Sequence, residues 1–224
     1  FFSNVVFISN FLLPLKNPII LIFCSIFIIF NFYNRFDFLK YKYIYLISII
    51  NLSILSISSY DINFQYDAGY YHLNYQNWLR EEKLIFGLNN LNAAFGTSSI
   101  IDYLSAPLWI GNNLILLHYI TIFFLVVLAN FLFYHIFISY NKYFYLSSIL
   151  IIFFAFLDNF GLNGGRNGFF TIHGIIKPDV ASGVVFYLCC LFLTYIFINK
   201  HYKKIEILTL NILIIFSYQL KISS

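Results

Sequence analysis

Asp67 and His72 are the residues whose types and spacing could do chemistry in this chain. They stand in the run Tyr66-Asp67-Ala68-Gly69-Tyr70-Tyr71-His72-Leu73. A carboxylate can take a proton from a hydroxyl as a general base, and a nearby imidazole can hold the same substrate. On an α-helix, two residues five apart diverge by more than one turn, and this spacing is no HExxH metal signature. The pair predicts general-base chemistry at Asp67, or, alternatively, a carboxylate that only caps a helix.

The residues after Asp67 predict a short helix over 68–83. Tyr71, Tyr75, Trp78 and Leu79 recur at helical spacing and form one apolar face, which charged residues close at 80–83. Such a helix could lie in a membrane interface with its aromatic rings at the level of the lipid headgroups. Trp78 is therefore a second candidate for contact with a substrate.

A second group of candidates comes later in the chain. The segment 158–178 is rich in glycine and carries Arg166 and Lys177, so it could bring cations and backbone N–H groups to a phosphate. Alternatively, this segment is an ordinary flexible loop that binds no phosphate. Asp179 follows Pro178 at a typical helix start, and Lys221 ends an apolar run where a cation could bind a lipid phosphate.

The amino-acid composition indicates which kind of secondary structure carries these residues. The chain is 61% hydrophobic and 10% charged, far below the roughly 25% charged residues of soluble domains. Its apolar runs approach the roughly 20 residues that cross a bilayer as a helix. The sequence predicts an all-α polytopic bundle, one domain over 1–224, with seven spans near 1–15, 18–34, 43–60, 113–138, 143–157, 179–199 and 205–220.

Charge predicts the direction of these spans. The short segments 35–42, 139–142 and 200–206 are net positive, which is typical of cytoplasmic loops. They alternate with a large external loop over 61–112, which is net negative and is expected to carry short interfacial helices, and with a second external loop over 158–178. All the candidate residues then fall on one face of the membrane.

Several motifs of the chain resemble those of a known protein family. The run 66–73, Trp78, the segments 87–92 and 95–99, Pro178-Asp179 and Lys221-Ile222-Ser223 resemble motifs of a poorly characterised family of bacterial polytopic membrane proteins. Those proteins look like GT-C glycosyltransferases, which use polyprenyl-phosphate-linked sugars outside the membrane. The resemblance implies Asp67 as the general base, with Arg166, Lys177 or Lys221 holding the donor phosphate. It departs from the usual GT-C pattern in placing three spans before the loop and in lacking a paired acid.

The expected function is therefore sugar transfer from a lipid-phosphate donor to a glycan or lipid acceptor at the external face of a bacterial inner membrane. No cofactor is expected; a divalent metal is compatible with the sequence but not indicated by it. Nucleic-acid binding is not expected. A transporter or flippase for lipid-linked glycans and a non-enzymatic membrane scaffold remain open as alternatives. The chain has no methionine and begins inside an apolar run, which predicts a piece of a longer protein.

Overall fold

The computed structural model describes residues 2–35, 38–59, 67–97, 99–111, 113–139, 141–157, 178–199 and 203–221. In these residues every regular element is a helix, and the only paired extended backbone is an isolated bridge between Ile110 and Asn113. The predicted all-α class is confirmed. Each of the seven predicted spans coincides with one long helix or, in the case of α1, a shorter one.

The helices follow the apolar runs of the sequence. The main ones are α1 (Phe2–Leu12), α2 (Pro18–Arg35), α3 (Phe38–Ser58), α4 (Leu73–Glu81), α5 (Ile100–Ser105), α6 (His118–Phe137), α7 (Lys142–Leu157), α8 (Asp179–Asn199) and α9 (Lys204–Leu220). Short helical turns link them: η2 (Ala68–His72), η3 (Leu88–Asn90), η4 (Ala93–Thr97), η5 (Ala106–Leu108) and η6 (Ile115–Leu117).

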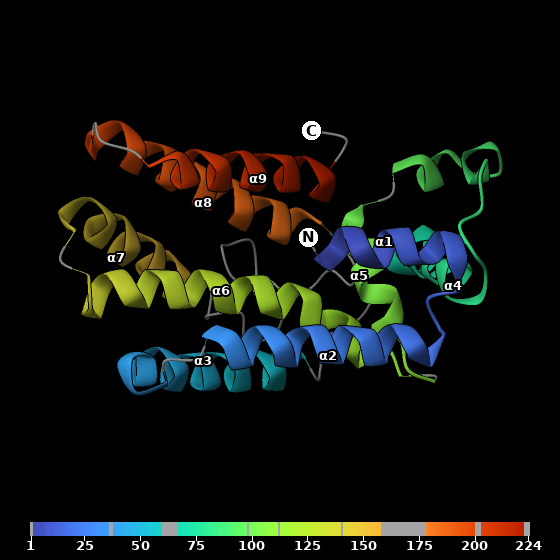
Figure 1. Cartoon of the computed structure of the whole chain (residues 1–224), viewed down its shortest axis with the longest axis horizontal. Coiled ribbons are helices and arrows are strands. Elements are labelled where there is room, and N and C mark those ends of the chain that lie inside the picture. Colours follow the sequence, from blue (N-terminus) through green and yellow to red (C-terminus); the bar gives the residue numbers. More distant parts are fainter. Residues whose placement is uncertain are drawn as a thin grey trace.

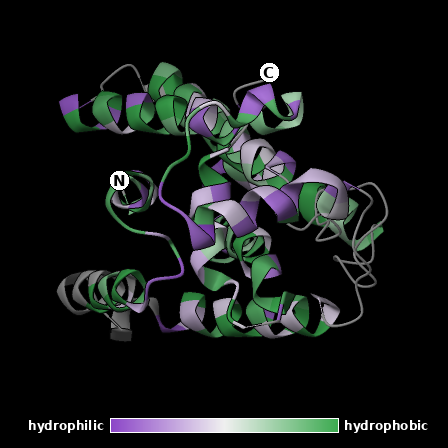
Figure 2. Ribbon diagram, turned by 90° about the vertical axis from the view of Figure 1, so that its right-hand side faces the viewer, coloured by the Kyte–Doolittle hydropathy of each residue, from purple (hydrophilic) through white to green (hydrophobic). Residues whose placement is uncertain are grey.

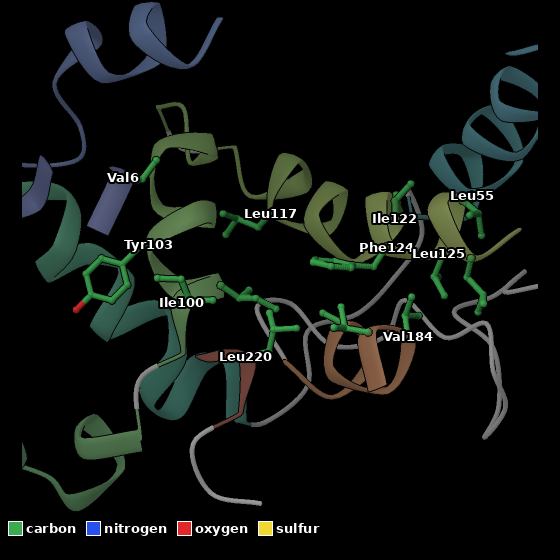
Figure 3. Packing of buried hydrophobic residues seen from close by; sticks show 14 of the residues in the cluster. Val6, Leu55, Ile100, Tyr103, Leu117, Ile122, Phe124, Leu125, Val184 and Leu220 are labelled. Carbon is green, nitrogen blue, oxygen red and sulfur yellow. The ribbon is translucent and has the colours of Figure 1, made fainter. Parts of the chain in front are cut away.

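Helix α6 is the centre of the bundle. It contacts α3, α7, α8 and α5, whereas α9 packs mainly on α8. Figure 3 shows Ile122 and Leu125 of α6 in the packed interior near Leu55 of α3 and Val184 of α8, whereas Leu117 of η6 lies nearer Ile100 of α5. None of these side chains is exposed. A helix that is apolar on all sides is buried by its neighbours in this way.

Two helices in the described part of the chain are long and apolar enough to cross a membrane. They are Ile115–Phe137 and Asp179–Ile198. Three further apolar stretches, Phe2–Leu12, Lys42–Ser58 and Phe144–Leu157, are shorter than this test requires, and α1 has only 11 residues. Eleven residues rise about 16 Å, roughly half of the hydrocarbon core of a bilayer. By length and composition, then, two of the seven predicted spans satisfy the test as single helices.

Several hydroxyl side chains within the apolar helices are satisfied by their own helix. Ser9, Ser48 and Thr209 each donate to the carbonyl four residues earlier, at 2.7–2.8 Å. Such bonds let a hydroxyl stay in an apolar helix without a partner from outside. The polar residues in these runs therefore do not interrupt the helices.

The two ends of the bundle differ. Figure 1 shows the end of α2, the start of α3, the end of α6, the start of α7, the end of α8 and the start of α9 at one end (left). α1, α4 and the segment after α4 lie at the other end (right), and Figure 2, which looks onto that end, shows hydrophilic residues interspersed among the hydrophobic ones. The helix ends that flank the three basic segments therefore share one end, and the sidedness predicted from charge stays a prediction.

Candidate functional site

Asp67 and His72 flank a π-helical turn. The turn η2 covers Ala68–His72, and its end is marked by the Leu73 N–H bonding to the Ala68 carbonyl, five residues back. In this register residues five apart lie on successive turns, whereas an α-helix would turn them away from each other. The turn therefore places Asp67 and His72 on one face of the helix. Single π-turns inside α-helices occur frequently at functional sites.

The helix predicted over 68–83 is confirmed, since the chain is helical from Asp67 to Glu81. Asp67 stands at its N-cap with helical backbone angles, and its side chain makes no capping hydrogen bond. The simple capping role considered for Asp67 is therefore not seen. Asp67 and His72 are both half-buried, and the His72 ring lies 4.2 Å from that of Tyr71.

The aromatic face of this helix packs inside the protein. Tyr75 and Leu79 are buried, and the rings of Tyr75 and Trp78 lie 6.0 and 5.6 Å from that of Phe95. The Tyr75 hydroxyl lies 3.2 Å from that of Tyr103 on α5. The expectation that this face rests among lipid headgroups is wrong, because η4 and α5 cover it. Trp78 belongs to that packing and is half-buried.

Asn10 joins α1 to the end of α4. Its side chain is fully buried, and its amide group donates to the carbonyls of Leu79 and Glu82, both at 3.2 Å, and of Leu13 at 3.3 Å. The Leu84 N–H in turn donates to the Asn10 carbonyl at 2.9 Å. These bonds satisfy carbonyls at a helix end that has no further partners within the helix. The helix that carries Asp67 is thus fixed to α1.

We expect Asn10→Ala to lower the free energy of unfolding by about 2–3 kcal/mol, because buried carbonyls lose their donor. Asn74→Ala is the matched control. Its amide bonds to the Tyr70 carbonyl at 3.1 Å, but in an exposed position, so a change under about 0.5 kcal/mol is expected. Equilibrium unfolding in mixed micelles measures both values. Equal losses in the two variants would contradict the docking role of Asn10.

Asp102 is buried in a capping box at the start of α5. The Ser99 hydroxyl accepts from the Ile101 N–H at 3.2 Å, and the Asp102 carboxylate accepts from the Ser99 N–H at 2.7 Å. Gln76 of α4 donates to the Asp102 carbonyl and carboxylate at 2.7 and 3.3 Å. Burial raises the pKa of Asp102 to about 7, against the lowering effect of the bonds from Ser99 and Gln76.

The Asp102 carboxyl therefore holds its proton more tightly in the folded state than in the unfolded one. Stability is expected to fall as the pH rises from about 4 to about 7 and to level off above that, by on the order of 4 kcal/mol in all. Asp102→Asn, which keeps an acceptor for the Ser99 N–H, should flatten this dependence. Unfolding measured across this pH range tests the expectation. An unchanged slope in the variant would contradict it.

Among the predicted site residues, Asp179 and Lys221 form an ion pair in the structure. The Lys221 ammonium lies 2.7 Å from the Asp179 carboxylate, joining the start of α8 to the end of α9. The Ser99 hydroxyl donates to the Leu220 carbonyl at 2.6 Å, so α5 is tied to the same place. Arg166, Lys177 and all of the predicted loop 158–178 except Pro178 lie outside the described residues.

An apolar hollow of about 490 Å³ lies against the second half of α9. It lies among α1, α5, α6 and α9, and its lining includes Phe2, Leu104, Phe124, Phe216 and Gln219. At its edge the Asn4 and Gln219 amides exchange hydrogen bonds at 3.0 and 3.3 Å. The hollow is suited to a hydrocarbon chain, and Lys221 follows two residues after Gln219.

Two buried charged residues, one on α4 and one on α5, were not among the predicted site residues. Arg80 was expected on a charged surface at the helix end, yet it is only 7% exposed. Its position four residues after Gln76, which is also buried, is a helical spacing that could have indicated a shared inner face. Asp102 follows Ser99 by three residues, the spacing of a capping box, and that signal was available in the sequence.

In the described ranges no three His, Cys, Asp or Glu side chains gather where they could hold a metal ion. Comparisons of the chain with protein-family models, curated proteins and solved structures give no match.

Proposed function

We propose that this protein is a polytopic membrane glycosyltransferase of GT-C type that transfers a sugar from a lipid-phosphate donor at one face of the bilayer. The observation that carries the proposal is the π-helical turn that sets Asp67 and His72 on one face of a docked helix. A half-buried carboxylate can accept a proton from a hydroxyl, and an imidazole on the same helical turn can hold the same substrate.

The membrane location is supported by the outer surface of the bundle. Large apolar side chains are exposed along several helices, among them Ile22 and Ile26 of α2, Leu46 and Ile49 of α3, Phe153 and Phe156 of α7, Phe186 and Phe197 of α8, and Ile212 and Ile215 of α9. Apolar surface of this extent is rare on soluble monomers and is typical of membrane contact. We infer that the helices beyond the two long spans also enter or cross the bilayer.

A lipid-phosphate substrate is supported by the apolar hollow against α9 and by the cation that follows this helix. The apolar lining would take the hydrocarbon chain. Lys221, two residues beyond Gln219 of the lining, would meet the phosphate. The Asp179–Lys221 pair is partly exposed, and such pairs contribute only about 0–1 kcal/mol. A phosphate could therefore replace Asp179 as the partner of Lys221 at small cost. Arg166 and Lys177 would add further positive charge to the same phosphate.

The transfer step follows from these roles. Asp67 takes the proton of an acceptor hydroxyl while the acceptor oxygen forms a bond to the anomeric carbon of the sugar. The bond from that carbon to the phosphate oxygen breaks, and the lipid phosphate leaves with the electron pair. The configuration of the sugar is inverted. His72 and Trp78 would hold the reacting sugars.

The test is to reconstitute the chain in vesicles with a panel of polyprenyl-phosphate sugars and to measure glycosylated acceptor. We expect transfer from at least one donor. If the folded, inserted protein transfers no sugar but moves a labelled donor between leaflets, the flippase alternative replaces the proposal. If it does neither, the scaffold alternative remains.

A further inference from the structure

A polar pocket of about 460 Å³ lies at the other end of α1 from the apolar hollow. Its lining includes Lys16, Asn77, Arg80, Glu81 and Trp109. The connection between α1 and α2 forms one wall, because the N–H groups of residues 15 and 16 donate to the carbonyls of residues 79 and 80 at 3.0 and 3.1 Å. The segment 107–111 closes the other side.

Arg80 is the unusual residue of this pocket. Only 7% of the surface of Arg80 is exposed to solvent. Its guanidinium stacks over the Trp109 ring, 4.6 Å from the ring centroid. None of the described residues accepts a hydrogen bond from this side chain, and its Nε atom is buried without a partner. The neighbouring carboxylate of Glu81 is bound to Lys16 at 2.8 and 3.1 Å.

A buried cation of this kind normally has an anion beside it. Removing a charge from water costs several kcal/mol, and a guanidinium recovers this only through acceptors placed at its N–H groups. Stacking on an aromatic ring offsets part of the cost but satisfies no hydrogen bond. The pocket beside Arg80 is the space in which an acceptor can stand.

The charges of the lining indicate which anion fits. Arg80 and Lys16 are positive and Glu81 is negative, so a ligand with a single negative charge balances the pocket. A guanidinium fork matches two oxygens of a phosphate, and the Asn77 amide can donate to a third. The start of α2 also lines the pocket, at Leu21, which would place it near the level of lipid phosphates if α2 enters the bilayer.

We propose that this pocket is a binding site for a singly charged phosphate diester, held by Arg80 with Lys16 and Asn77. The diester could be the headgroup of an anionic phospholipid or a soluble compound. The site is separate from Asp67 and Lys221, and its occupation does not depend on sugar transfer.

The test uses Trp109 as the reporter, in a Trp78→Phe background that leaves it as the only tryptophan. The chain is placed in phosphatidylcholine nanodiscs, and its emission is followed in two titrations. One raises the mole fraction of phosphatidylglycerol; the other adds diethyl phosphate to the buffer. We expect a saturable change in at least one titration. A change with lipid alone assigns the headgroup as the source, and a change with both assigns a pocket open to soluble diesters.

Three variants make the test specific. Arg80→Gln should weaken binding by about tenfold or more. Lys83→Gln, which removes an exposed cation just beyond the same helix without touching the pocket, should leave binding unchanged. Glu81→Gln removes the competing carboxylate from Lys16 and should tighten binding by up to about fivefold. This opposite sign is not expected of a variant that merely loosens the fold, and it remains measurable if Arg80→Gln fails to fold.

Several results would overturn the proposal. The first is that the Trp109 emission of the parent shows no saturable change in either titration. The second is that the parent and Arg80→Gln bind equally well, and the third is that Lys83→Gln weakens binding as much as Arg80→Gln does. Acetate that binds as tightly as diethyl phosphate would overturn the assignment to a phosphate. Weaker binding by Glu81→Gln would overturn the charge balance on which the choice of ligand rests.

Discussion

Replacing Asp67 by asparagine is expected to reduce the rate of sugar transfer by about 10²- to 10⁴-fold while leaving the protein folded. The amide has nearly the shape of the carboxylate but cannot take the proton of the acceptor hydroxyl. Asparagine is also a favourable residue at a helix N-cap, the position that Asp67 occupies, so the helix start should persist. Transfer from the best lipid-linked donor, measured in vesicles beside the parent, gives the ratio.

Glu82→Gln is the matched control for this experiment. Glu82 is an exposed carboxylate at the far end of the same helical segment, and its replacement changes the net charge by the same amount. We expect the control to transfer sugar at the parental rate. Transfer by Asp67→Asn at the parental rate would remove Asp67 as the base. A loss of transfer accompanied by an equal loss of folded protein would instead indicate a structural role.

Leu125→Ala is expected to lower the free energy of unfolding by about 2–5 kcal/mol. Leu125 is fully buried on α6, the helix that contacts α3, α5, α7 and α8. Removing its side chain leaves a cavity at the centre of these contacts. Within a membrane, helix association depends chiefly on such close packing, because lipid is as apolar as leucine. Unfolding in mixed micelles measures the loss.

Leu150→Ala is the control for this second variant. Leu150 lies on α7 and is 51% exposed, so the same atoms are removed where no cavity forms. A loss under about 0.5 kcal/mol is expected. If Leu150→Ala costs as much as Leu125→Ala, the centre of packing does not lie on α6.

The positions of the helices were predictable because they depend on local properties of the chain. Apolar runs of suitable length favour helices, and their few hydroxyls bond to carbonyls of the same helix, as Ser48 does. Pro178 and Asp179 indicate the start of α8, and the helical spacing of Tyr71, Tyr75 and Trp78 indicates the helix after Asp67. Each signal depends on residues within a few positions of one another.

What covers these helices was not predictable from such signals. The aromatic face of α4 was expected among lipid headgroups, yet Phe95 and Tyr103 cover it. The π-helical register between Asp67 and His72 also escaped prediction, since the same residues fit an α-helix as well. The cover over the aromatic face comes from neighbours distant along the chain.

A set of apolar helices with a polar segment between them follows from the amino-acid sequence, because hydropathy and helix formation are local. Only the tertiary structure decided that Lys221 meets Asp179, 42 residues earlier, that Asp102 is enclosed by Gln76, and that Arg80 is buried over Trp109. The charge and type of these residues are visible in the sequence. Their partners and their exposure to solvent are not, because both depend on contacts between segments that only the folded chain brings together.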